Sequence, residues 1–348
     1  MSAARARSLV WIKEEGSDTP PPLAILAGRG WSTHVLGFRY DRFRRFRIGR
    51  WIRLFMAIGH VLSVRFGFRR ATLVVGTHYA GLMAAILRSV KLPPRFGVVV
   101  HSVYAIPESQ DRGILNWIVR TGLRRCDAVV VNSTHIARKL LAERLVSSPS
   151  RIFVLTDGPP PVVLTARHQA RYAFSGGNSA RDWDGLAAVV RASSLDVDWI
   201  IACPARVARR FSDVPRVRVL TDVPVDTFDA LVAGASIVVA MLLQGPVAGV
   251  TLVRAAQAAG AVVIACGSSH LSEYVESGVD GVLARDIDDA SQWVLKAWRD
   301  ETTAAGFRQR ALARAELDRR EAQEANVKLA DFLERVGASF GSAELQAV

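Results

Sequence analysis

The sequence predicts an α/β protein made of two doubly wound domains, each built on a parallel sheet with helices on both faces. Short apolar runs alternate with segments of helical period from one end of the 348 residues to the other, which indicates parallel strands joined by right-handed crossover helices. Twelve such runs are more than one sheet usually holds. A proline-rich break near the middle of the chain divides them between two domains.

The strand candidates are mostly runs of four to seven residues that are apolar almost throughout, as expected of strands buried on both faces. They are residues 9–12, 33–38, 72–76, 97–101, 128–132, 152–155, 172–175, 199–202, 218–220, 237–241, 262–265 and 281–283. The helical segments between them are residues 48–65, 79–90, 112–124, 134–145, 182–193, 226–234, 250–259, 269–277 and 288–298.

Three consecutive prolines, Pro159 to Pro161, stiffen the chain into an extended segment and place the domain boundary. We expect a first domain over residues 1–158, a linker over 159–171 and a second domain over 172–301. The alanine-, arginine- and glutamate-rich stretch 302–348 predicts a long C-terminal helix that crosses back to the first domain.

Half of the residues are hydrophobic and 22% are charged, a globular composition and not a disordered one. The net charge of +13 favours a partner with negative charge, such as nucleic acid, anionic lipid or a phosphate-bearing substrate. The abundance of arginine, alanine and valine is equally consistent with a GC-rich genome.

The three cysteines, Cys126, Cys203 and Cys266, lie far apart beside apolar runs. They have neither the spacing of a zinc site nor that of a disulfide framework, so we interpret them as small core residues in a reducing compartment. The first residues lack the apolar stretch of a signal peptide, and no apolar run is long enough to span a bilayer. We therefore expect a cytoplasmic protein, either free or peripheral on the inner face of the cell membrane.

The most informative segment is residues 245–284, which contains two glycine-bearing turns after predicted strands. The loop ending at Gly249 leads into a helix that opens with Val250-Thr251, and a second turn leads into a helix that opens with Ser268-Ser269. Helix N-termini present free backbone N–H groups and a positive dipole end at the carboxyl edge of a parallel sheet, where phosphates bind. The segment predicts a diphosphate site.

A second segment, residues 174–190, has Gly176 and Gly177 at the end of a strand and Arg181-Asp182 before a helix. The glycines let the backbone approach a ligand closely. Arg181 is either a bidentate partner of a diphosphate or a solvated surface arginine. Asp182 has the side chain and position of a helix N-cap.

Two histidines end predicted strands of the first domain. His101 ends the apolar run 97–101, and His78 follows the run 72–76. The carboxyl ends of parallel strands are where ligands bind, and histidine titrates near neutral pH. Both side chains are candidates for a site, the alternative being hydrogen-bonded histidines that cap the sheet.

Residues 245–284 resemble the nucleotide-sugar segment of family-4 glycosyltransferases, and Glu273, Gly278 and Gly281 fall on positions of that motif. The match covers about forty residues well and the rest of the C-terminal half more loosely. The resemblance implies a GT-B fold, with two Rossmann-like halves facing a cleft and the donor bound mainly by the second. It also implies retention of anomeric configuration, no metal and no cofactor, and a histidine at the position of His101 that faces the transferred sugar.

The sequence departs from the family pattern in three places. The paired glutamates of the family would fall at Val247 and Ala255, so their contacts to the donor would have to come from Gln244, Thr251 or Glu273. The glycine-rich loop after the first strand is also missing, and Gly16 alone remains for a close approach on the acceptor side.

Residues 38–55 interleave seven arginines with aromatic residues. We expect Arg42, Arg45, Arg50 and Trp51 to face an anionic membrane surface. The alternatives are an arginine-rich helix face with its aromatics in the core, and a nucleic-acid surface, which no nucleic-acid-binding motif in the sequence supports.

These observations favour a glycosyltransferase that moves a sugar from a nucleoside-diphosphate-sugar donor to a glycan or lipid-linked acceptor. One alternative is a nucleotide-sugar 2-epimerase on the same fold, whose chemistry needs several carboxylates. The other is an inactive subunit of the same fold that binds a partner glycosyltransferase or a membrane.

Overall fold

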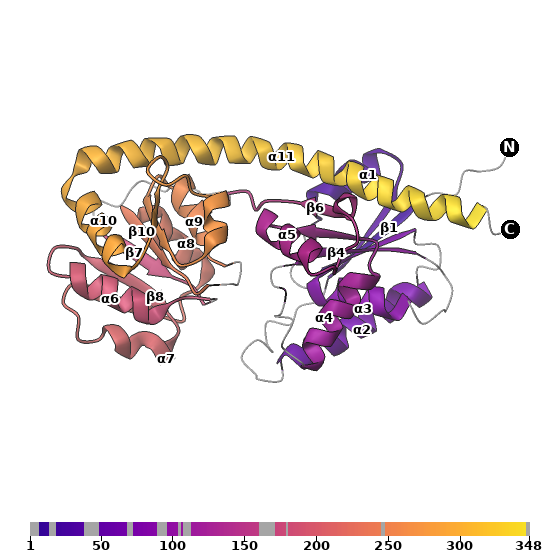
Figure 1. Ribbon diagram of the computed structural model, residues 1–348, viewed down its shortest axis with the longest axis horizontal. Helices are drawn as coiled ribbons and strands as arrows, with labels where there is room; N and C mark the ends of the chain where they lie inside the picture. Colours follow the sequence, from indigo (N-terminus) through magenta and orange to yellow (C-terminus); the bar gives the residue numbers. More distant parts are fainter. Residues whose placement is uncertain are drawn as a thin grey trace. The chain divides into compact units, whose positions relative to one another are not determined.

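The computed structural model describes residues 7–13, 19–37, 49–67, 72–88, 96–103, 106, 113–159, 171–178, 180–244 and 248–345 (Figure 1). It divides into two compact units, one of residues 1–156 with 323–348 and one of residues 157–322. Each unit contains a six-stranded parallel sheet flanked by helices. The predicted fold class, two doubly wound α/β units, is therefore confirmed.

The sheet of the first unit has the order β2-β1-β3-β4-β5-β6, and its strands pair in parallel along well-defined registers. The strands are β1 (Ser8–Lys13), β2 (Ser32–Gly37), β3 (Leu73–Thr77), β4 (Gly97–Val103), β5 (Ala128–Val131) and β6 (Ile152–Val154). The helices are α1 (Pro21–Gly28), α2 (Gly49–Gly67), α3 (His78–Arg88), α4 (Ile114–Arg125) and α5 (Thr134–Ala142), with a 3-10 helix, η2 (Pro149–Arg151).

The second sheet has the order β12-β11-β10-β7-β8-β9. The strands are β7 (Ala173–Gly176), β8 (Trp199–Cys203), β9 (Val217–Thr221), β10 (Ile237–Met241), β11 (Val262–Cys266) and β12 (Val282–Ala284). The helices are α6 (Trp183–Ser193), α7 (Ala205–Ala208), α8 (Val225–Gly234), α9 (Val250–Ala258) and α10 (Ile287–Arg299), with the 3-10 helices η3 (Arg209–Phe211) and η4 (Ser269–Glu273).

The last helix, α11 (Glu301–Leu345), contributes to both units. Its residues up to Ala322 belong to the second unit, and those from Gln323 onward belong to the first. In the first unit, Leu329, Phe332 and Leu333 are almost fully buried in the core beneath the sheet. Most of the linker expected at 159–171 lies outside the described residues.

The structure corrects one predicted helix. Residues 269–277 do not form an α-helix, because the segment is a single 3-10 turn over Ser269–Glu273. Leu271 and Tyr274 are both buried there, and a helix with three residues per turn places residues i and i+3 on the same side. The structure also contains two helices that the sequence pattern did not predict: α1, which is short and begins with two prolines, and the four-residue α7.

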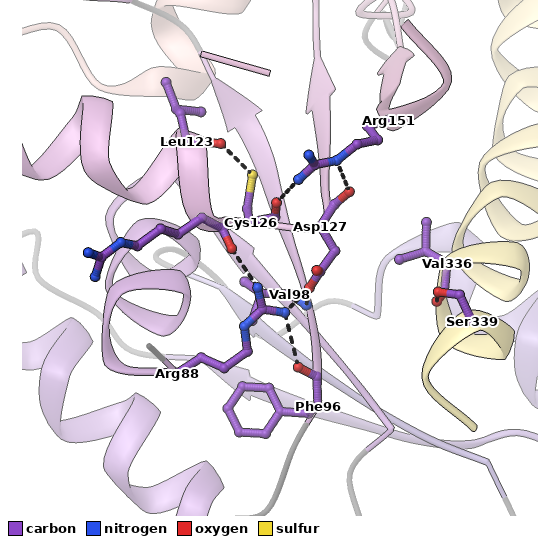
Figure 2. A network of polar contacts seen from close by, with 10 residues as sticks. Arg88, Phe96, Val98, Leu123, Cys126, Asp127, Arg151, Val336 and Ser339 are labelled. Carbon is purple, nitrogen blue, oxygen red and sulfur yellow. Dashed lines mark hydrogen bonds and ion pairs between the residues drawn. The ribbon is translucent and has the colours of Figure 1, made fainter. Parts of the chain in front are cut away.

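At the amino edge of the first sheet, Asp127 joins two strands and two helices (Figure 2). Its carboxylate pairs with the guanidinium of Arg88, at the end of α3, and accepts a 2.7 Å hydrogen bond from the backbone N–H of Val98. Arg88 also donates to the carbonyl of Arg125 at 2.5 Å, and Arg151 Nε donates to the carbonyl of Asp127 at 2.7 Å. The network lies at the edge opposite to that where the strands end.

We expect Asp127→Ala to lower the free energy of unfolding by about 2–3 kcal/mol, because the partly buried Arg88 loses its carboxylate partner and the Val98 N–H loses its side-chain acceptor. Urea denaturation of the variant measures this loss. Glu316→Ala is the matched control, since that carboxylate pairs with Arg319 and Arg320 on an exposed face of α11 and should cost less than about 1 kcal/mol. Equal losses in the two variants would contradict the role assigned to Asp127.

Candidate functional site

The candidate site is at the carboxyl edge of the second sheet, where the loops after β7, β10 and β11 meet. Gly176 and Gly177 end the first of these strands. A Cβ atom on Gly176 would lie 2.7 Å from the ring of Phe228, and one on Gly177 would lie 2.7 Å from Nη2 of Arg181. Gly177 also has a φ of +121°, which side-chain-bearing residues rarely adopt. The Gly-Gly pair is therefore required by close packing and by backbone conformation.

The backbone on either side of Arg181 is hydrogen-bonded to the end of β10. The N–H of Leu243 donates to the carbonyl of Ala180 at 2.9 Å, and the N–H of Asp182 donates to the carbonyl of Met241 at 3.0 Å. Ala180 has a φ of +48°, a left-handed conformation that costs an L-residue about 1–2 kcal/mol. The fold thus tolerates a strained residue in order to hold Arg181 in place.

The guanidinium of Arg181 lies between the two glycine turns. Its Nη2 is beside Gly177, and its Nη1 would be 3.0 Å from a Cβ atom on Gly249. The Nε and Nη1 atoms are buried and have no hydrogen-bond partner among the described residues. Burial lowers the pKa of Arg181 to about 10, so the group is still charged at neutral pH. A buried cation with free donors is the counterpart of an anionic ligand.

The second element of the site is the N-terminus of α9. Gly249 is its N-cap residue, with a φ of +80°, and the nine-residue helix begins at Val250 as the sequence predicts. Val250 is buried and Thr251 is exposed. The positive end of the α9 dipole is therefore next to Gly249, and the Arg181 guanidinium packs against the same residue.

The third element is the turn after β11. Gly267 has a φ of +107°, and a Cβ atom there would lie 1.9 Å from the carbonyl oxygen of Leu242, so only glycine fits. Ser268 is buried and Ser269 is exposed at the start of the 3-10 helix η4. The second α-helix that the sequence predicted at Ser268-Ser269 is therefore replaced by the five-residue 3-10 helix η4. The longer helix at this edge is α9.

His270 is a site residue that the sequence analysis missed. The imidazole is 2% exposed, and its Nε2 is 3.0 Å from the carbonyl oxygen of Ala248, in the loop before α9. Because a carbonyl oxygen only accepts, Nε2 carries the proton; in the neutral ring Nδ1 then accepts from Ser268 Oγ at 2.5 Å. The signal that could have revealed it is a histidine directly after a Gly-Ser-Ser turn at a strand end.

The positions of the family glutamates are occupied by apolar residues. Ala255 is 7% exposed and packs in the core, and Val247 lies outside the described residues. The three candidate substitutes are accessible, since Gln244 and Thr251 are exposed and Glu273 is half-buried.

The inner side of α9 is fixed to α11 by a buried ion pair. Arg254 pairs with Asp318, and both side chains are 3% exposed. Arg314 Nε also donates to Asp318 at 3.0 Å, and the guanidinium of Arg254 lies 4.8 Å from the ring centroid of Tyr274. Gln257 Nε2 completes the cluster with a 2.9 Å hydrogen bond to the carbonyl of Tyr274. These contacts hold α9 firmly on its buried side.

A cavity of about 480 Å³ opens at the same edge of the second sheet, a volume within the range of small-molecule sites. It is lined by Asp182, Met241, Leu242, Cys266, Gly267, Asp286, Ile287 and Asp288. Two of its carboxylates have structural roles, because Asp182 caps α6 at the N–H of Gly185 and Asp286 caps α10 at the N–H of Asp289.

In the first unit, His101 is near the carboxyl end of β4 and pairs in register with Thr77 of β3, the residue before His78. A register shift between β4 and β5 includes Ser102, whose φ is +60°, as in a β-bulge. His101 Nδ1 is 2.5 Å from Ser102 Oγ, and its ring packs 4.9 Å from that of Trp11. Burial lowers the pKa of His101 to about 4, so the imidazole is neutral at physiological pH.

The other predicted residues are on the acceptor side and in the arginine-rich segment. Gly16, Arg42 and Arg45 are outside the described residues, and Arg50 and Trp51 are in α2 with side chains that are not described. Among the described residues, no helix has both the length and the apolarity to cross a bilayer, and no group of three or more metal-ligating side chains is found.

Comparison with known proteins identifies the fold. HepE from Anabaena, in complex with UDP and glucose, superimposes with a TM-score of 0.66 at 15% identity, covering 94% of this chain and all of the other. WaaG, a glycosyltransferase involved in lipopolysaccharide biosynthesis, gives 0.65 at 12% identity, covering 93% and 99%. The fold is that of GT-B glycosyltransferases.

A putative UDP-N-acetylglucosamine 2-epimerase from Listeria monocytogenes also matches, with a TM-score of 0.57 at 12% identity over 89% of this chain and 94% of the other. No family model and no curated protein matches the sequence. Because all of these identities are low, the likeness establishes the architecture, and the function has to be argued from the site.

The depressed pKa of His101 predicts a pH-dependent stability. As pH falls below about 6.5, the ordinary value, the unfolded histidine takes up a proton, whereas the folded one does so only near 4. His101 should therefore cost up to about 3 kcal/mol of stability between pH 6.5 and 4.

His101→Gln should remove this part of the pH dependence, as measured by urea denaturation at pH 7.5, 5.5 and 4.5. The control is His34→Gln, which removes a histidine from the edge strand β2. If the pH profile of His101→Gln matches that of the wild type, His101 is not held neutral by burial.

Proposed function

We propose that the protein is a glycosyltransferase that uses a nucleoside-diphosphate sugar and binds the diphosphate at Arg181 and at the N-terminus of α9. The observation that carries this proposal is the buried guanidinium of Arg181, whose Nε and Nη1 have no hydrogen-bond partner among the described residues. A diphosphate supplies both the charge and the acceptor oxygens that these donors need. The cavity at the same edge of the sheet offers room for another part of the donor.

In such a reaction the glycosidic bond of the donor breaks and negative charge develops on the departing diphosphate. A guanidinium and a helix N-terminus fixed in advance stabilise that charge without rearrangement. These groups take the place of a metal, so we propose that transfer needs no metal and no cofactor. Retention of the anomeric configuration is proposed on the resemblance to family 4.

We assign His101 to orient the transferred sugar, again on the resemblance. A pKa of about 4 makes its ring neutral at physiological pH, which suits hydrogen bonding to a hydroxyl group. The acceptor is proposed to be a glycan or a lipid-linked saccharide, with Gly16 and His78 as candidates for its binding.

The two alternatives make different demands on the site. A 2-epimerase needs free carboxylates for acid–base work, and two of the aspartates in the cavity are already engaged as helix caps. An inactive subunit does not need a buried arginine poised for a ligand. The geometry around Arg181 therefore favours the transferase.

We also propose that the first unit docks on an anionic membrane surface. Helices α2 and α4 both pack against α3 (Figure 1), and neither contains an acidic residue. Phe55 of α2 and Ile114 and Trp117 of α4 are 67%, 58% and 59% exposed. Exposed aromatic and aliphatic side chains beside arginines are typical of interfacial helices.

Replacement of Arg181 by methionine should act in opposite directions on binding and on stability. Affinity for the cognate nucleoside diphosphate should fall by about 1.5–3 kcal/mol, because charge-assisted hydrogen bonds are lost. The free energy of unfolding without nucleotide should stay equal or rise, because a buried cation is replaced by an apolar chain of similar length. Isothermal calorimetry in EDTA with UDP, GDP, ADP and dTDP, and thermal denaturation, give the two quantities.

Arg191→Met is the matched control, since that arginine is exposed on α6 of the same unit and should leave both quantities unchanged. Equal affinity in wild type and Arg181→Met would exclude Arg181 from the site. Binding that appears only after Mn²⁺ is added would contradict the metal-free proposal.

The membrane proposal predicts co-sedimentation with phosphatidylglycerol vesicles that weakens as salt rises. The triple variant Arg42→Glu, Arg45→Glu and Arg50→Glu should abolish it, at about 1 kcal/mol for each arginine near the surface. Trp117→Ser should weaken it, whereas Val225→Ser, at an equally exposed apolar residue of the second unit, should not. A wild type that ignores anionic vesicles at low salt would rule out membrane docking.

A further inference from the structure

We propose that His270 is a positioning residue for the diphosphate site, because it fixes the orientation of the peptide bond between Ala248 and Gly249. The inference rests on the proposed function and assigns a role to a side chain that lies one loop away from the ligand. Its basis is the hydrogen bond of His270 Nε2 to the carbonyl oxygen of Ala248, at 3.0 Å.

In a trans peptide the C=O and the N–H of the next residue point in opposite directions. Because the Ala248 carbonyl points toward His270, the N–H of Gly249 points away from His270. Gly249 is the residue against which Nη1 of Arg181 lies, and it is the N-cap of α9. Its N–H is thereby held as one of the donors at the positive end of the helix.

This peptide needs an external restraint because of the glycine. Gly249 has a φ of +80°, and glycine populates negative φ about as readily. Rotation of this peptide plane by half a turn would keep Gly249 in an allowed region of φ. The carbonyl oxygen of Ala248 would then point at the site in place of the N–H of Gly249. An oxygen there would repel a diphosphate. The side chain of His270 supplies the hydrogen bond that disfavours the flip.

The imidazole is itself held rigidly. It is 2% exposed, and its Nδ1 is 2.5 Å from Ser268 Oγ, which sets the rotation of the ring. Ser268 follows Gly267, whose Cα hydrogens pack on the carbonyl of Leu242 so closely that no side chain fits. The restraint on Ala248 thus comes from the turn after β11. It connects that turn to the loop before α9.

Glutamine and asparagine separate the two contacts of the ring. The amide nitrogen of glutamine matches the position of the histidine Nε2 and can donate to Ala248, whereas asparagine reaches only as far as Nδ1. We therefore expect His270→Gln to bind the nucleoside diphosphate nearly as the wild type does, and His270→Asn and His270→Ala to bind about tenfold more weakly. Affinity for the nucleoside without phosphates should not change.

The probe is UDP compared with uridine, or the corresponding pair for whichever of GDP, ADP and dTDP binds the wild type. Amide hydrogen exchange without nucleotide is the second measurement, and it should show faster exchange at Gly249 and Val250 in His270→Asn and His270→Ala but not in His270→Gln. Thermal denaturation checks that each variant is folded, and Ser268→Ala, which loosens the ring without removing it, should give a smaller loss in the same direction.

The outcomes separate the two proposals. If no nucleoside diphosphate binds the wild type, the proposed function is wrong, and hydrogen exchange still decides whether His270 restrains the loop. If UDP binds the wild type and folded His270→Asn equally well, or if all three variants lose uridine and UDP affinity alike, His270 does not position the peptide for phosphate.

Discussion

The candidate site of the second unit is built around a guanidinium whose Nε and Nη1 are shielded from water. Burial lowers the pKa of Arg181 to about 10, which corresponds to a cost of about 3 kcal/mol for keeping the group charged. The surrounding structure adds to this cost with the left-handed Ala180. An anion between Gly177 and Gly249, as proposed, would restore the interactions that the guanidinium has lost.

The charge can be held in this way because α9 is anchored on its other side. A buried ion pair adds little net stability when compared with apolar residues, but it defines geometry well, since either partner alone would be very unfavourable. The pair of Arg254 with Asp318 connects α9 to the first part of α11. Tyr274 packs on the same guanidinium and accepts from Gln257 through its backbone, so η4 belongs to the same cluster. The loops of the candidate site are thereby supported by buried side chains.

The sequence was sufficient for the twelve strands, because strands buried on both faces are apolar almost throughout and glycine or proline interrupts them. It was not sufficient for η4, since a buried Leu271 and Tyr274 three residues apart suit a 3-10 turn as well as an α-helix. The position of Arg181 could be predicted from Gly-Gly and a following helix cap. The burial of the Arg181 nitrogens depends on Gly249, about 70 residues further along the chain. The hydrogen bond of His270 to Ala248 joins two loops about 20 residues apart. Hydrophobic periodicity carries no information about such contacts between loops.

Alanine at position 255, where the family-4 pattern has a glutamate, has a structural counterpart. Ala255 is in the core of the unit, and its neighbours Arg254 and Gln257 use the buried side of α9 to hold α11 and η4. A carboxylate at 255 would be buried in the apolar core of the unit, where it would be costly without a partner. The sequence change is therefore consistent with a helix whose polar residues serve as an anchor. In the proposed transferase, contacts to the donor's hydroxyl groups would come from accessible side chains on the loops, of which Gln244 and Glu273 are candidates. Affinity would then come from the diphosphate, because Arg181 and the N-terminus of α9 are the fixed elements of the candidate site, and the choice of sugar would come from the loop residues.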